Sequence, residues 1–292
     1  MIRSPPRTRD RYKPAPTEIP LTGRGVHIGN RRQLALAATD FLEGISSIHL
    51  WPKLGWLEIR QRYRRSVLGP FWLTISMGAL IGGMGPLYGR LFGLDISTYF
   101  PFLAVGFVVW QFLASIINDS CMAFISAEGY IKQMKLPFTV HVLRMVWRNV
   151  IIFAHNAVIV FLVIVFWPPA ATWHLLLIAP ALLLLALNGI WIGVTLGLVC
   201  ARFRDIPQIV VSLVQVAFFL TPIMWNSGML GRRHWAVEWN PFYHFLEVVR
   251  SPLVAATTNW TSWAAVLAIT TVGYAATFLL FARFRARIAY WV

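Results

Sequence analysis

Charged residues are scarce in this sequence, and the long stretches without them indicate where helices could cross a membrane. Only 13% of the 292 residues are charged, 58% are hydrophobic, and the mean hydropathy is +0.63. Soluble domains are typically about half apolar and a quarter charged. The five long windows without Asp, Glu, Lys or Arg are residues 71–89, 96–118, 149–201, 206–231 and 251–282. A membrane-spanning helix needs about 20 apolar residues, so we predict an all-α membrane protein with six transmembrane helices, two of them in the longest window.

The motifs of nucleotide-binding and hydrolytic enzymes are also missing. The sequence has no GxxxxGK[ST], GxGxxG, HExxH or GxSxG segment, so the usual residues for nucleotide, metal-assisted or serine hydrolysis are absent. We therefore expect a chain that is not an enzyme, with no catalytic residue and no cofactor of its own. If ATP drives its activity, a separate subunit must bind the ATP and its magnesium.

Metal-ligand spacings and charges in the middle of the predicted helices are missing too. Cys121 and Cys200 belong to no CxxC pair, and we interpret them as free thiols. The histidines have no ligand spacing, so no metal site is expected; His155 and His174 lie near predicted span ends. Proton- or sodium-coupled carriers place charged residues at mid-membrane depth. Their absence here disfavours secondary transport.

Basic residues are abundant, and their distribution indicates membrane topology and not nucleic-acid binding. The net charge is +15, and with the N-terminus in the cytoplasm twenty-two of the 26 Lys and Arg lie on the cytoplasmic side. The other side keeps Arg90, Arg232, Arg233 and Arg250. The positive-inside rule then predicts a multi-pass protein of a bacterial inner membrane with both termini cytoplasmic.

The chain divides into three regions. Residues 1–30 are basic and rich in proline without the apolar core of a signal peptide, and we predict a disordered cytoplasmic tail. Residues 31–69 interleave aromatic and basic residues, which predicts an amphipathic helix lying among the lipid headgroups. A basic flank that only sets topology explains this composition as well. Residues 70–292 hold the six predicted spans.

One stretch between the fifth and sixth predicted spans has a conflicting composition. Residues 226–260 are too long for a turn and too apolar for a solvated loop, so we predict short helices that re-enter the membrane. Pro241 disfavours helical geometry at Asn240 and is suited to a first helical turn, which predicts a break between two helices. Glu247 and Arg250, three residues apart, are expected to form an ion pair.

Three segments in a fixed order resemble those of a known family. They are RQRYRRSVLGPFWLTISMG, RDIPQIVVSLVQVAFFLTPIMW and NPFYHFLEVVRSPL. Residues 35–292 are similar to the transmembrane subunits of ABC-2 type polysaccharide exporters, which export O-antigen, capsule and teichoic acid chains. The resemblance implies a permease homodimer powered by two ATP-binding cassette subunits. Its implied substrate is an undecaprenyl-pyrophosphate-linked glycan, of the O-antigen type used in lipopolysaccharide biosynthesis or of the capsule type.

The resemblance also implies a coupling helix in the first cytoplasmic loop, at about residues 126–136. This segment is short, polar and followed by Pro137, as a helix docking in a groove of a soluble partner would be. The residues expected to contact the ATP-binding partner are Glu128, Tyr130, Lys132, Gln133 and Lys135.

Two further groups of residues are candidates for contact with the substrate. Guanidinium groups pair with phosphate in bidentate fashion, so Arg60, Arg62, Arg64 and Arg65 are candidates for the lipid pyrophosphate, although topology alone explains them equally well. Aromatic rings stack on the apolar faces of sugars. The expected glycan-channel residues are Phe218, Phe219, Trp225, Phe242 and Tyr243, against the alternative of ordinary lipid-facing aromatics.

Two other functions are weighed against glycan export. An ABC-2 exporter of a small lipid or drug fits the same motifs and would have a narrow or closed tunnel with few polar groups. A membrane-embedded glycosyl- or acyltransferase would need a cluster of carboxylates or histidines at the membrane face, and the sequence shows none.

Overall fold

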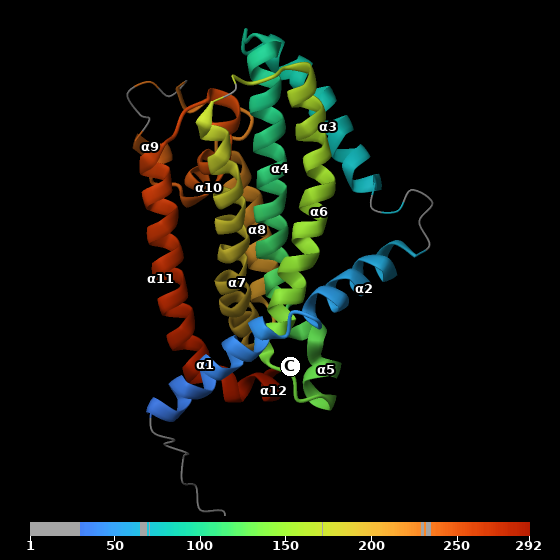
Figure 1. The fold of residues 1–292 in the computed structure, drawn as a ribbon, viewed down its shortest axis with the longest axis vertical. Coiled ribbons are helices and arrows are strands. Elements are labelled where there is room, and N and C mark those ends of the chain that lie inside the picture. Colours follow the sequence, from blue (N-terminus) through green and yellow to red (C-terminus); the bar gives the residue numbers. More distant parts are fainter. Residues whose placement is uncertain (1–29, 65–68, 70, 171, 229–230, 232–234) are drawn as a thin grey trace, which may run out of the picture.

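The computed structural model describes residues 30–64, 69, 71–170, 172–228, 231 and 235–292. In these residues the chain forms helices and turns but no strand. Five helical segments are long and apolar enough to cross a membrane, and they stand side by side in Figure 1. They are α3 (Phe71–Leu91), α4 (Ile96–Cys121), α6 (Phe138–Phe166), α7 (Ile178–Arg202) with the preceding 3-10 turn η2 (Trp173–Leu177), and α11 (Trp260–Phe284) with the C-terminal segment after it. The chain is therefore a multi-pass membrane protein.

The fifth predicted span is a shorter helix than expected. α8 (Ile206–Leu220) has 15 residues, which at about 1.5 Å per residue is shorter than the roughly 30 Å hydrocarbon layer. It ends two residues before Pro222, as a helix must when the residue before proline is driven out of the helical region. The structure thus has five spanning helices and one short apolar helix where the sequence predicts six spans.

The remaining helices lie at the two ends of the bundle (Figure 1). The lower end carries α1 (Asn30–Ser46), α2 (Trp51–Tyr63), η1 (Ile125–Ala127), α5 (Glu128–Gln133), η5 (Arg285–Arg287) and α12 (Ile288–Trp291). The upper end carries α9 (Trp235–Glu238), α10 (Pro241–Arg250) and the π-helical turn η4 (Ser251–Ala255). We call these the α5 end and the α10 end. The first described helix and the C-terminus both lie at the α5 end, while the predicted tail falls almost wholly outside the described residues.

α4 is the central helix of the bundle. It packs against α3, α6, α7, α8 and α10, and its buried residues run from Tyr99 to Cys121. Three glycines of α7, spaced four residues apart, permit close packing, as small residues do in membrane helices. A Cβ atom would lie 3.1 Å from Ile116 if added at Gly189, 2.5 Å from Val142 at Gly193 and 2.9 Å from Phe124 at Gly197.

α3 is attached to the bundle much more loosely. Only Ile81, Gly85 and Gly89 of this helix are buried, and Figure 1 shows it at the edge of the bundle. Gly82 and Gly83 have no atom within 4 Å of where a Cβ would lie. Gly85 and Gly89 of α3 are therefore buried, whereas Gly82 and Gly83 face open space.

The predicted interface segment forms two helices, and one buried carboxylate holds the first of them in place. Asp40 of α1 is 1% exposed. Its carboxylate accepts hydrogen bonds from the backbone N–H groups of Phe138 (3.1 Å) and Thr139 (3.0 Å), which are unpaired donors of the first turn of α6. It also pairs with Nε of Arg285 at 2.9 Å, beyond the end of α11. Asp40 thus joins α1, α6 and the C-terminal segment.

Replacing Asp40 tests this junction. Asp40→Ala removes the cap of α6 and the partner of Arg285, and we expect it to lower the free energy of unfolding by about 3 kcal/mol. The measurement is the thermal unfolding midpoint of the detergent-solubilised protein. Glu43→Ala, an exposed position on the same helix, is the matched control. Equal midpoints for the two variants would contradict the assignment.

Candidate functional site

Three adjoining hollows follow one side of α4. Their volumes are about 230, 330 and 470 Å³, starting from the α5 end. The first two share Arg62 and Asp119 as lining residues, and the last two share Met77, Leu80 and Gln111. Side chains from α2, α3, α4, α6 and α8 therefore line one continuous depression, which we call the α4 groove.

The middle of the α4 groove is polar although it lies between apolar helices. Gln111, Ser115 and Asp119 follow one another at intervals of four residues, which places them on one face of α4. Nε2 of Gln111 donates to Oγ of Ser115 at 3.3 Å. From α6, Asn149 donates to Asp119 at 2.8 Å, and Asn156 also lines the hollow. Amide and hydroxyl groups inside a membrane bundle mark a path for a polar ligand.

Four charged residues meet at the α5 end of the groove and join three helices. Glu58 of α2 pairs with Arg144 at 3.1 Å and with Arg148 at 2.5 Å, both on α6. Arg148 also pairs with Asp119 of α4 at 2.7 Å. The side chains of the two arginines are only 6% and 15% exposed. We call these four residues the Glu58 cluster.

The Glu58 cluster reaches the predicted coupling helix through Arg144. Its guanidinium carbon lies 5.3 Å from the ring centroid of Tyr130 on α5, within cation–π distance. A displacement of α5 would therefore move Arg144 and, through the ion pairs of the cluster, Glu58 on α2 and Asp119 on α4.

α5 itself presents its polar residues to solvent. Each of the predicted coupling residues is exposed: Glu128, Tyr130, Lys132, Gln133 and Lys135. Nζ of Lys132 lies 2.6 Å from the Glu128 carboxylate, and this hydrogen bond lowers the pKa of Glu128. Buried Phe124 and Ala127 fix the preceding turn to the bundle. The helix is thus held at its base and free on its outer face.

The four arginines predicted to bind pyrophosphate are not equivalent in the structure. Arg62 lines two hollows of the α4 groove, one helical turn after Glu58. Arg60 and Arg64, which are exposed as Arg62 is, line none of its three hollows. Arg65 lies outside the described residues. Of the three arginines that the structure describes, Arg62 alone lines the groove.

The predicted channel aromatics are only partly brought together. Phe218 and Phe219 of α8 line the third hollow with Phe107 and Trp110 of α4. The rings of Phe218 and Trp110 are 5.8 Å apart.

The other three predicted aromatics do not line the α4 groove. Phe242 lies 5.4 Å from Trp110, behind the hollow. Trp225 is half-buried and lines none of the three hollows. Tyr243, whose side chain is packed into the bundle, has a pKa raised by burial and lines none of them either.

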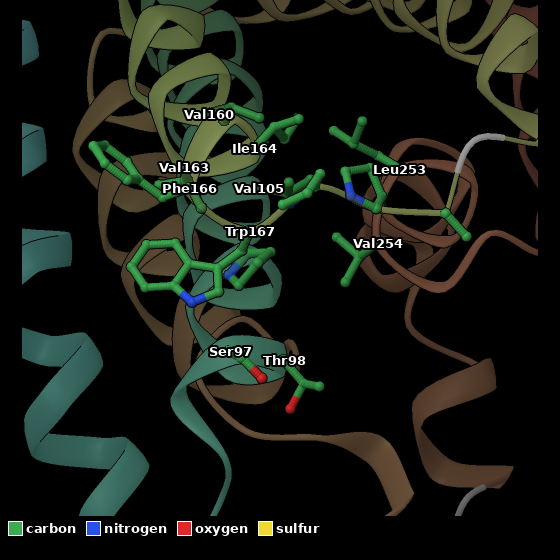
Figure 2. A pocket seen from close by; sticks show the side chains of 14 residues that line it. Ser97, Thr98, Val105, Val160, Val163, Ile164, Phe166, Trp167, Leu253 and Val254 are labelled. Carbon is green, nitrogen blue, oxygen red and sulfur yellow. The ribbon is translucent and has the colours of Figure 1, made fainter.

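A separate pocket of about 410 Å³ lies at the α10 end, between α4, α6 and η4. Figure 2 shows Leu253 and Val254 across the pocket from Val160 and Ile164, with Ser97 and Thr98 at its edge. Its walls are aliphatic on one side and carry the aromatic rings of Phe166 and Trp167 on the other. A π-helical turn such as η4 is often found at functional sites.

Arg250 holds the α10 end together. It is 3% exposed, and its Nη1 donates to the carbonyl of Pro222 at 2.8 Å. Its Nη2 pairs with Glu247 at 2.9 Å, so the structure brings the two predicted partners together. The guanidinium also lies 4.1 Å from the ring centroid of Phe102 on α4. The predicted break is present as well, since Asn240 caps α10 and Pro241 opens it.

Removing the charges of the Glu58 cluster tests its role. Glu58→Ala leaves Arg144 without its acidic partner in a nearly buried site, and we expect a loss of about 3 kcal/mol of unfolding free energy. The thermal midpoint reports the loss, and Gln61→Ala, an exposed position on the same helix, is the control. An unchanged midpoint for Glu58→Ala would show that the cluster does not join the helices.

Arg250→Ala should be more damaging than the removal of an exposed base. It leaves the Glu247 carboxylate and the Pro222 carbonyl without this donor, at a cost of about 3 kcal/mol. The comparison is with Arg90→Ala, whose side chain is exposed. Limited proteolysis should cut near α10 only in the Arg250 variant, and equal resistance of both variants would contradict this role.

The chain is similar to a known protein family and to several curated proteins. The model of the ABC-2 type transporter membrane family matches residues 51–254. The chain is 27% identical to an O-antigen export system permease protein RfbA of Klebsiella pneumoniae, over 70% of this chain and 79% of the relative. It is 28% identical to a second such protein of K. pneumoniae, over 63% and 72% of the two chains. It is 21% identical to one of Myxococcus xanthus, over 58% and 65%.

Proposed function

Because this chain belongs to the ABC-2 type transporter family, we propose that it is the permease subunit of an ATP-driven exporter of a lipid-linked polysaccharide. The relatives are named O-antigen export permeases, and an O-antigen or capsule chain is the proposed cargo. The single observation that carries this proposal beyond the family is the α4 groove, which combines hydroxyl and amide groups with aromatic rings.

The chemistry of the α4 groove suits a sugar polymer. Gln111 and Ser115 offer donors and acceptors to hydroxyl groups, while Phe218 and Phe219 offer rings to the apolar faces of sugars. A chain of repeating units can slide along such weak contacts without being held at any one. A small hydrophobic drug would gain little from the polar middle of the groove.

A second copy of the chain is proposed to complete the channel. The α4 groove lies between α3 and α8, and both helices present apolar residues outward, including Leu87, Leu213 and Val216. The open glycines Gly82 and Gly83 of α3 permit close approach of another helix. A homodimer would cover these faces and turn two grooves into one enclosed path.

The ATP-binding subunits are proposed to dock at the α5 end, in the cytoplasm of a bacterium. Arg62, Lys132, Arg204 and Arg285 all belong to this end, in agreement with the positive-inside rule. The membrane is then the inner membrane, and α10 would lie at its outer face as a re-entrant segment. Tyr130, Arg144 and Glu58 would transmit the motion of α5 to the helices that line the groove.

The export assay tests the proposed cargo. In cells that depend on this chain, Gln111→Leu should reduce surface polysaccharide several-fold, because the leucine removes a polar contact from the groove. Leu162→Ala, on the exposed face of α6, is the control and should export normally. Normal surface polysaccharide in cells lacking the chain, with altered resistance to a small lipid or drug, would favour the alternative exporter and overturn the proposal.

The coupling residues are tested by one combined variant. Glu128→Ala, Tyr130→Ala, Lys132→Ala and Lys135→Ala together should leave membrane insertion intact, since all four side chains are exposed. Export should fall below a tenth of the wild-type value, and the ATP-binding subunit should no longer copurify. Lys53→Ala, exposed on α2, is the control. Normal export by the combined variant would show that the partner docks elsewhere.

A further inference from the structure

The hollow of the α4 groove nearest α5 has a composition unlike that of the other two. Its volume is about 230 Å³. Its lining residues are Glu58, Arg62, Asp119, Met122, Ala123, Ser126, His141, Arg144, Met145 and Arg148. Six of these ten side chains are ionisable, whereas the third hollow is lined by none.

His141 contributes an unpaired polar group to this hollow. It is 1% exposed, and neither of its ring nitrogens has a hydrogen-bond partner among the described residues. Nε of Arg148 is also buried without a partner there. Buried polar groups are nearly always hydrogen-bonded in native proteins. Two unpaired groups beside one hollow therefore require partners, which a bound ligand or buried water molecules would supply.

The charge balance of the hollow favours an anion. Three arginines face two carboxylates, and Arg62 makes no ion pair with any described residue. Arg148 and Arg144 share the two carboxylates, so Arg62, which lines the hollow but is exposed to solvent, supplies the uncompensated positive charge. A neutral sugar would leave this charge unpaired, whereas a phosphate oxygen would accept from it.

The size of the hollow restricts the anion further. A water molecule occupies about 30 Å³ in the liquid, so the hollow has room for roughly seven waters. That is enough for a phosphate or diphosphate group but not for a folded stretch of polysaccharide. Ser126 adds a hydroxyl that can donate to the same group.

We propose that this hollow binds a phosphate or diphosphate group, with Arg62, Arg144 and His141 as its ligands. The source of the phosphate is the headgroup of the glycan lipid, and on this point the inference rests on the proposed function; a free phosphate anion has the same chemistry. Because Arg144 also contacts Tyr130, the bound group would touch a side chain that faces the coupling helix.

Binding to the full chain in lipid nanodiscs tests the site. The ATP-binding subunit is left out, because its nucleotide site would itself bind phosphate. The probes are radiolabelled farnesyl diphosphate and inorganic pyrophosphate. The variants are Arg62→Gln and His141→Phe, neither of which removes a hydrogen bond or ion pair made in the structure. Arg60→Gln, exposed on the same helix and outside the groove, is the matched control.

We expect the wild type and Arg60→Gln to bind farnesyl diphosphate equally, and Arg62→Gln and His141→Phe to bind it at least about tenfold more weakly. If inorganic pyrophosphate displaces farnesyl diphosphate, the site accepts phosphate from either source. If it does not, the site requires the lipid headgroup. Equal binding by all four proteins, or none by the wild type, would overturn the site. Loss of binding in the variants with no dependence of surface polysaccharide on the chain would retain the site and reject the proposed function.

Discussion

The ion pairs around Glu58 are the interaction on which the arrangement of the groove depends. Two arginines of α6 are almost removed from water, and charges in that position require partners. Glu58 from α2 and Asp119 from α4 supply them, so the requirement to neutralise Arg144 and Arg148 fixes where α2 crosses the bundle and how α4 is rotated. That rotation in turn directs the face bearing Gln111 and Ser115 into the groove.

The same cluster connects two processes that must occur together in an ATP-driven exporter. α5 is exposed, as the proposed docking of an ATP-binding subunit requires, and Arg144 lies between its Tyr130 and the acid on α2. Salt bridges at this depth have a small number of favourable geometries, so a shift of α5 is expected to move the cluster between discrete arrangements. In the proposed function, Arg144 and Arg148 would therefore have a coupling role besides the structural role that their ion pairs show.

Structural features that depend on one continuous stretch of residues could be predicted from the sequence. The charge-free windows predicted the spanning helices, and the Asn240-Pro241 step predicted the start of α10. The end of α8 is marked in the sequence by Pro222 alone, because the apolar window continues past Leu220.

Features made by distant segments could not be predicted in the same way. Asp40 and Thr139 are 99 residues apart, and no local pattern pairs them. The polar face of α4 did leave a signal, the four-residue spacing of Gln111, Ser115 and Asp119, but such a spacing acquires meaning only when a neighbouring helix is known to lie opposite. His141 illustrates the same limit, since its lack of a partner is a property of the folded chain.

Because α3 is packed only loosely against the bundle, the two walls of the α4 groove differ in stiffness. One wall is α4, the most enclosed helix of the bundle, whereas the opposite wall is a helix with three buried residues, joined to α4 by a short turn that contains Gly93 at a φ of +63°. Segments with few buried contacts open at the lowest free-energy cost. In the proposed function, α3 would swing about that glycine and widen the α4 groove while the rest of the bundle keeps its packing, so that successive sugars of unequal girth could pass without the core being rearranged for each.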